Sequence, residues 1–145
     1  MTDLRPLLTK GLRPGIYRWQ SDAGADQVRR DVAGAGWDFV LLDTSEIHDK
    51  SAFLDLCATA FDLPRWFGRN WDALADSLSD RSTGEPEIVL WTGLHHLLEH
   101  DHDTVDVALQ IFAEDTTASG QLRVLIQLER DQTPDLLRSL PLLGQ

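Results

Sequence analysis

Three aspartates at four-residue intervals are the residues of this chain best suited to chemistry or binding. Asp72 and Asp76 are four positions apart, and Asp80 follows after another four. On a helix, residues at this spacing lie on one face, so the carboxylates would form a row. Like charges at this spacing destabilise a helix by about 0.2–0.5 kcal/mol per pair. Because no basic residue stands at matching spacing, we expect the countercharge to come from elsewhere; the simpler alternative is a solvated polar face.

The surrounding segment predicts how this row is positioned. Residues 63–78 read Leu-Pro-Arg-Trp-Phe-Gly-Arg-Asn-Trp-Asp-Ala-Leu-Ala-Asp-Ser-Leu. Pro64 is expected to end the preceding helix, and Gly68 to supply the backbone freedom that a tight bend needs. Asn70 then stands where the N-cap of a new helix belongs. The apolar stripe that turns this helix toward a core consists of Trp71, Leu74 and Leu78.

This run resembles the signature of the barstar family, whose members are small intracellular inhibitors of microbial ribonucleases related to barnase. The matching residues are Leu63-Pro64, the aromatic pair Trp66-Phe67, Gly68, Asn70-Trp71-Asp72-Ala73-Leu74 and Asp76. The resemblance extends over about residues 38–127 and is most specific in this motif. It implies a three-stranded parallel sheet with helices packed on it, and a ribonuclease inhibitor that is not an enzyme and needs no cofactor.

The resemblance also implies which residues would meet the ribonuclease. Carboxylates on a rigid helix would replace RNA phosphates and accept charge-assisted hydrogen bonds from the basic residues of the active site. We expect Asp76 to be the most deeply inserted group, and Asp80 to extend the same acidic edge. The partner-binding residues expected in this way are Trp66, Gly68, Asn70, Asp72, Ala75, Asp76, Asp80 and Glu114.

Three positions depart from the best-known pattern of the family. Ala75 stands where the best-known member of the family carries a large aromatic residue, and Arg65 and Arg69 carry positive charge where that member is acidic. These departures bear on the identity of the partner more than on the class of activity. The partner is therefore expected to be a basic extracellular-type ribonuclease of the barnase class or a related nuclease domain of a toxin.

Composition and charge favour the same kind of partner. The chain has 145 residues, 42% of them hydrophobic, which is enough for one domain with a core. Its 24 acidic and 13 basic residues give a net charge of −11, so it should repel nucleic acid and attract a basic protein. Cys57 is the only cysteine, which excludes an internal disulfide. Neither a secretory signal nor a membrane span is recognisable, and we expect a cytoplasmic protein.

Apolar runs and helix breakers predict an α/β fold with a small parallel sheet. A family-like core of three strands is expected at 37–42, 87–92 and 122–128. An added N-terminal strand at 15–20 is expected to join the same sheet. Helices are expected at 22–33 with an Asp22 cap, at 50–61, in the motif, within 93–102, and from a cap at Asp103 or Thr104. Residues 79–86 read as a loop. The expected organisation is a loose arm (1–14), one domain (15–133) and a C-terminal tail (134–145) that packs as a partial helix.

Two other functions remain open at this point. His95, His96, His100 and His102 lie within eight residues, and the spacing of His96 and His100 suits metal chelation on a helix. Alternatively, the acidic residues Asp72, Asp76 and Glu114 could surround a magnesium ion. Either site would make the protein a metal-dependent hydrolase, although the chain has neither a glycine-rich phosphate loop nor a plausible nucleophile triad. The remaining alternative is a scaffold that binds another basic protein.

Overall fold

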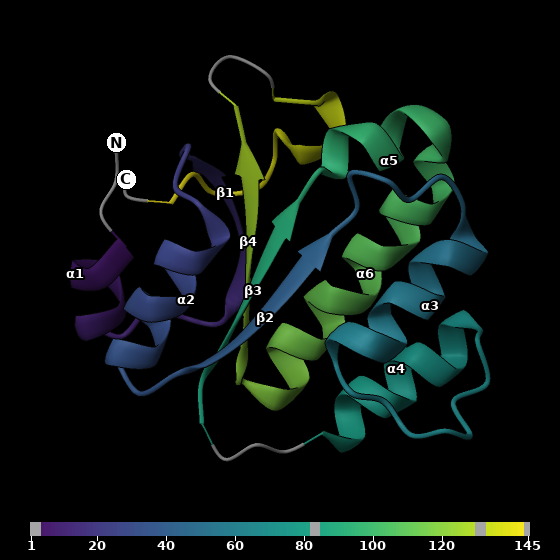
Figure 1. Cartoon of the computed structure of the whole chain (residues 1–145), viewed down its shortest axis with the longest axis horizontal. Helices are drawn as coiled ribbons and strands as arrows, with labels where there is room; N and C mark the ends of the chain where they lie inside the picture. Colours follow the sequence, from purple (N-terminus) through teal and green to yellow (C-terminus); the bar gives the residue numbers. More distant parts are fainter. Residues whose placement is uncertain (1–3, 82–84, 130–132, 144–145) are drawn as a thin grey trace.

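The computed structural model describes residues 4–81, 85–129 and 133–143, and shows a parallel β-sheet between two layers of helices (Figure 1). The four strands run in the order β1-β4-β3-β2, and every neighbouring pair is parallel. They are β1 (Gly15–Gln20), β2 (Asp38–Asp43), β3 (Glu87–Thr92) and β4 (Leu122–Leu128). The predicted α/β fold is therefore confirmed, and the added N-terminal strand joins the sheet at the edge beside β4.

Alternating side chains along the strands divide the core between the two faces of the sheet. Val89 and Trp91 of β3 face one helical layer, whereas Ile88 and Leu90 face the other, and all four are fully buried. Covering both faces explains why the central strands are continuous apolar runs in the sequence.

The larger layer contains the four helices that carry or position the aspartate row (Figure 1). These are α3 (Lys50–Ala60), α4 (Trp71–Asp80), α5 (Leu94–His100) and α6 (His102–Ser119). The expected cap of α6 was wrong, because Asp101 accepts the capping hydrogen bond from the Thr104 amide at 3.2 Å. The expected 79–86 loop begins later than predicted, since α4 continues to Asp80; residues 82–84 of that loop lie outside the described residues.

The opposite layer consists of α1 (Leu4–Thr9) and α2 (Ala25–Gly34). The loose arm expected for residues 1–14 was wrong for the part described, because Leu4 and Leu8 are buried in one cluster with Trp19 and α2. Residues 1–3 of that arm lie outside the described residues. The N-cap of α2 is Gly24, not the expected Asp22, and it forms no side-chain capping hydrogen bond.

The C-terminal segment packs along the outer edge of β1. It contains a short 3-10 helix (Asp135–Leu137) whose Leu137 is fully buried, as expected for a partial helix. The Arg18 amide donates to the Pro141 carbonyl at 2.8 Å, and the Leu143 amide donates to the Arg18 carbonyl at 2.7 Å. These bonds occupy backbone groups that an edge strand would otherwise expose. Residues 144–145 of the expected tail lie outside the described residues.

Candidate functional site

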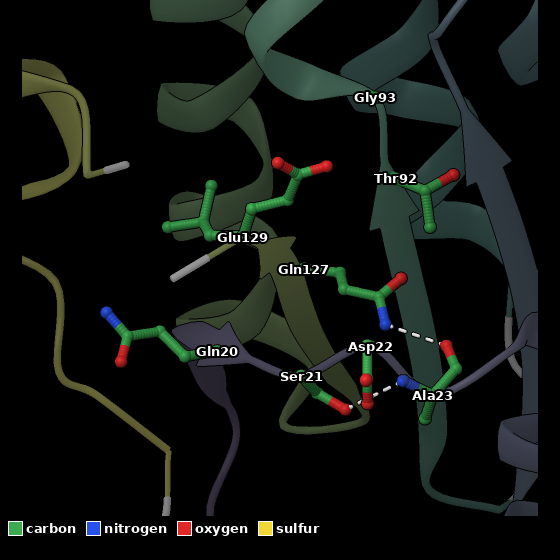
Figure 2. A pocket seen from close by; sticks show the side chains of 9 residues that line it. Gln20, Ser21, Asp22, Ala23, Thr92, Gly93, Gln127 and Glu129 are labelled. Carbon is green, nitrogen blue, oxygen red and sulfur yellow. Dashed lines mark hydrogen bonds between the residues drawn. The ribbon is translucent and has the colours of Figure 1, made fainter. Parts of the chain in front are cut away.

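Parallel sheets often bind ligands at the carboxyl ends of their strands, and an open cavity of about 610 Å³ lies there, beside the ends of β1, β3 and β4 (Figure 2). Gln127 spans part of it and donates a hydrogen bond from Nε2 to the Ala23 carbonyl at 2.8 Å. Its acidic side chains are Asp22 and Glu129, and none of the described lining residues is basic. An acidic lining of this kind repels anions, and none of the described lining residues is a histidine base that could activate the hydroxyls of Ser21 and Thr92 or a cation that could hold a phosphate, so this cavity does not suit catalysis on RNA.

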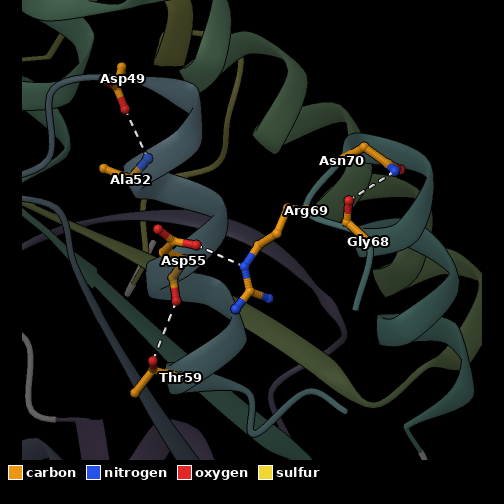
Figure 3. A network of polar contacts seen from close by, with 7 residues as sticks. All are labelled: Asp49, Ala52, Asp55, Thr59, Gly68, Arg69 and Asn70. Atoms are coloured by element: carbon orange, nitrogen blue, oxygen red, sulfur yellow. Dashed lines mark hydrogen bonds and ion pairs between the residues drawn. The ribbon is translucent and has the colours of Figure 1, made fainter. Parts of the chain in front are cut away.

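Helix α4 is fixed at its start by the predicted cap. The Asn70 side-chain oxygen accepts a hydrogen bond from the Ala73 amide at 2.7 Å, and its Nδ2 donates to the Gly68 carbonyl at 3.2 Å (Figure 3). Leu74 and Leu78 are buried, as the apolar stripe predicted. The cap and the stripe together fix the position and the rotation of the helix, and therefore which residues it exposes.

The bend before α4 is built differently from what Gly68 suggested. The left-handed residues here are Asp62, with φ 52°, and Arg69, with φ 53°, whereas Gly68 does not have positive φ. A non-glycine residue in this conformation costs roughly 1–2 kcal/mol. A Cβ at Gly68 would lie 3.1 Å from Nδ2 of Asn70, so a larger residue would crowd the side chain that caps α4. The expectation that Gly68 supplies conformational freedom was therefore wrong, because the left-handed position of the bend is Arg69.

The unusual arginine of the bend is paired within the molecule. Arg69 Nε lies 2.8 Å from a carboxylate oxygen of Asp55 on α3 (Figure 3). Its guanidinium also lies 5.1 Å from the ring centre of Phe67. Half-exposed ion pairs of this kind contribute little stability. The pair with Asp55 instead holds the guanidinium of Arg69 against α3, so the charge of Arg69 does not neutralise the aspartates of α4.

The aspartate row faces solvent. Asp72, Asp76 and Asp80 are exposed on α4, and Glu114 is exposed on α6, which packs against α4. Within the described residues, no side chain or backbone group forms a hydrogen bond or an ion pair with any of these four carboxylates. The structure thus brings the four predicted acidic residues onto one helical layer, and none of them is paired with another described residue.

The far end of α4 is held by a salt bridge that the sequence analysis missed. Arg81 follows the helix, and its two terminal nitrogens lie 2.9 and 2.7 Å from the two carboxylate oxygens of Glu87 at the start of β3. The Glu87 side chain is only 6% exposed, so water screens this pair weakly. Nearby on α6, burial raises the pKa of Asp115 despite a hydrogen bond from Ser119 and the charge of Arg81.

Trp66 is the large apolar side chain that the fold leaves in solvent. It is 84% exposed, and no other large hydrophobic residue in the described ranges is exposed. Phe67, its neighbour, is buried, so the two aromatics point to opposite sides of the loop. Ala75 is partly buried against the core and offers little surface. Arg65 is exposed and forms no ion pair with the described residues.

Neither of the two metal sites considered from the sequence forms as expected. Across the described ranges, Asp72, Asp76 and Glu114 do not come close enough together to hold one ion. The histidine cluster forms with different members: His96 and His100 approach His48, from the loop after β2. His95 pairs instead with Glu99 at 3.0 Å, and His102 lies outside the cluster. His48 lies 48 residues before His96, so sequence spacing offered no signal for it.

Comparison with known proteins assigns the chain to a family. The family model described as Barstar (barnase inhibitor) matches residues 37–130, which is well over half of the chain. This range contains α3 to α6, the three strands β2, β3 and β4, and the whole aspartate row. Comparison with curated protein sequences finds no match. The α/β fold with its parallel sheet is consistent with the family match, and the chain belongs to the barstar family of barnase inhibitors.

Proposed function

We propose that this protein inhibits a basic, barnase-like ribonuclease by inserting α4 and the loop before it into the active site. The observation that carries the proposal is the row of exposed carboxylates, Asp72, Asp76 and Asp80, which lack a partner within the described residues. In the complex they would accept hydrogen bonds from the Arg, Lys and His side chains that otherwise hold RNA phosphates. The inhibitor makes and breaks no covalent bond.

Rigidity of α4 supports this proposal. A flexible acidic segment would lose conformational freedom on binding, at a cost of about 0.5–1.5 kcal/mol per ordered side chain in addition to the ordering of its backbone. In this protein the Asn70 cap, the buried leucines and the Arg81–Glu87 salt bridge hold the helix before any partner arrives. The carboxylates therefore start from a backbone geometry that is already fixed.

Charge supports the choice of a basic partner. A net charge of −11 accelerates encounter with a positively charged enzyme, and salt slows such encounters. Trp66 would supply the apolar anchor, because Ala75 offers no large side chain and Trp66 is almost fully exposed. Arg65 lies next to this anchor in the loop, and we propose that it selects among ribonucleases by meeting an acidic group at the rim of the correct partner.

The proposal is tested by titrating a barnase-class ribonuclease with the protein while RNA cleavage is measured. We expect complete inhibition near one inhibitor per enzyme, weakened by added salt. Asp76→Asn removes one charge from the centre of the row and should raise the inhibition constant by about 30-fold to several thousand-fold, the range for breaking a desolvated charge pair. The matched control is Asp26→Asn, which makes the same change on α2, on the opposite face of the sheet.

The same experiment separates the remaining alternatives. Cleavage of RNA or esters by the protein alone, abolished by a chelator, would support a metal-dependent hydrolase instead. No inhibition of any barnase-class ribonuclease, together with no turnover, would favour a scaffold for another basic protein. Equal inhibition by the wild type and Asp76→Asn would contradict the assigned binding surface even if the protein proved to be an inhibitor.

A further inference from the structure

Three histidines from two distant segments meet at the carboxyl end of the sheet. His48 belongs to the loop of residues 44–49 between β2 and α3, and His96 and His100 are one turn apart on α5. The nitrogen atoms through which the three could bind a metal all lie within 4.8 Å of one another. We propose that His48, His96 and His100 form a binding site for a zinc ion.

The spacing of two of these imidazoles already suits a metal. Nε2 of His48 lies 3.2 Å from Nε2 of His96. Two nitrogens bound to one tetrahedral zinc ion at about 2.0–2.1 Å each are separated by about 3.3 Å. The ring centre of His100 lies 4.5 Å from that of His48 and 4.4 Å from that of His96. Small side-chain rotations would therefore bring the third nitrogen onto the same ion.

The orientation of His100 is a second, independent observation. Its Nδ1 lies 2.9 Å from the backbone carbonyl of His96. Because a carbonyl oxygen only accepts hydrogen bonds, Nδ1 must carry the proton, and Nε2 of the neutral ring keeps its lone pair. Zinc-bound histidines are commonly oriented by this kind of bond from the second nitrogen to a backbone carbonyl. The same tautomer leaves Nε2 of His100 free to bind a metal.

The backbone holds the two histidine-bearing segments together. Gly93 precedes α5 with φ 68°, and a Cβ at this position would lie only 2.4 Å from the Ser45 amide nitrogen. Thr44, at the start of the loop, is fully buried; its hydroxyl accepts a hydrogen bond from Trp91 Nε1 at 2.9 Å and donates to the Thr92 carbonyl at 3.2 Å. Figure 1 shows the loop after β2 and helix α5 at the same end of the sheet.

The site would connect the loop to α5 and leave a fourth position on the ion for water or for a side chain of a partner. It is separate from the aspartate row, so the proposal does not depend on ribonuclease inhibition. Without a metal, the His48–His96 contact is explained by one imidazole donating a hydrogen bond to the other. In that simpler arrangement, replacing His100 would leave the affinity for zinc unchanged. The effect of a His100 substitution on zinc affinity therefore distinguishes a three-histidine zinc site from a hydrogen bond between His48 and His96.

The test uses the untagged full chain. Calorimetric titration with zinc chloride should show one ion bound per chain, and cobalt(II) should give the visible absorption bands of a tetrahedral site. His48→Gln and His100→Gln should each lower zinc affinity at least about tenfold and weaken the cobalt bands. His102→Gln is the matched control, because His102 lies in the same stretch of chain but outside the cluster. Zinc should raise the thermal midpoint of the wild type and of this control only.

Equal zinc affinity in the wild type and His48→Gln would overturn the proposal, since it would leave only adventitious binding to surface histidines. An equal loss in His102→Gln would overturn it as well, because a different set of histidines would then hold the ion. Circular dichroism of each variant checks the fold; His48 and His100 are both exposed, so we expect no structural loss from either substitution.

Discussion

Replacing Asp76 by asparagine should strengthen the fold while it weakens the proposed inhibition. Asp76 stands four residues after Asp72 and four residues before Asp80 on α4, so its charge takes part in two repulsive pairs. Each pair costs the helix about 0.2–0.5 kcal/mol, and Asp and Asn have similar helix propensities. The substitution should therefore raise the free energy of unfolding by about 0.4–1.0 kcal/mol. For a chain of this length, the thermal midpoint should rise by about 1–3 °C.

Comparison among the three aspartates sharpens this prediction. Asp72→Asn removes one repulsive pair but also a favourable interaction with the helix dipole in the first turn, worth about 0.3–1 kcal/mol, so stability should change little. Asp80→Asn removes one pair and an unfavourable charge at the C-terminal end of the helix, so it should stabilise. All three variants should inhibit a barnase-class ribonuclease less well than the wild type.

The assay is thermal and urea unfolding of each variant at low and at high salt, alongside inhibition of RNA cleavage. The stability gain of Asp76→Asn should shrink in about 1 M salt, where the screening length falls to about 3 Å. A lower midpoint for Asp76→Asn at low salt would refute the reasoning, because it would mean that the carboxylate is stabilised within the free protein. A gain in stability without any loss of inhibition would place the binding surface elsewhere.

Three further substitutions test how the fold holds the site. Gly93→Ala should lower the free energy of unfolding, measured in urea, by about 3 kcal/mol, because it adds strain at a positive φ and a clash with the Ser45 backbone. A loss below about 1 kcal/mol would mean that the loop after β2 can move away from the start of α5. Glu87→Gln breaks the salt bridge with Arg81 and should lower the free energy of unfolding by about 3 kcal/mol. An unchanged urea midpoint would show that this salt bridge does not stabilise the fold. Burial raises the pKa of Asp115 in the folded state, so the folded protein holds this proton more tightly than the unfolded chain. Asp115→Asn should therefore stabilise at neutral pH, and its advantage should disappear as the pH falls through the raised folded pKa toward the ordinary value of 3.8; an advantage independent of pH would contradict this.

The strands were predictable because a strand that is buried on both faces of a sheet is a continuous run of apolar residues in the sequence. The apolar run around Val40 and the runs of β3 and β4 correspond to the observed strands within one residue. The sequence pattern of helix α1 is weaker. It has only six residues, and a helix this short depends on packing for its stability; its Leu4 and Leu8 pack in one cluster with α2, which a local pattern does not reveal.

The chemistry of the site was predictable only where it is local. The Asn70 cap and the exposure of the aspartate row follow from spacing along one helix, and the structure has both. The positive φ of Arg69 and its pairing with Asp55 depend on how α3 lies beside the loop, so the sequence assigned the bend to Gly68 instead. His48 joins the other histidines only through contact of the two segments after β2 and β3.

The most direct test of the central claim is competition between this protein and an active-site mononucleotide for a barnase-class ribonuclease. The apparent Kd of the complex is measured calorimetrically at increasing concentrations of the nucleotide. If the carboxylates of α4 occupy the phosphate-binding site, the apparent Kd should rise in proportion to nucleotide concentration once the nucleotide saturates the enzyme. A Kd that stays constant under saturating nucleotide would show that the protein binds outside the active site and would contradict the account.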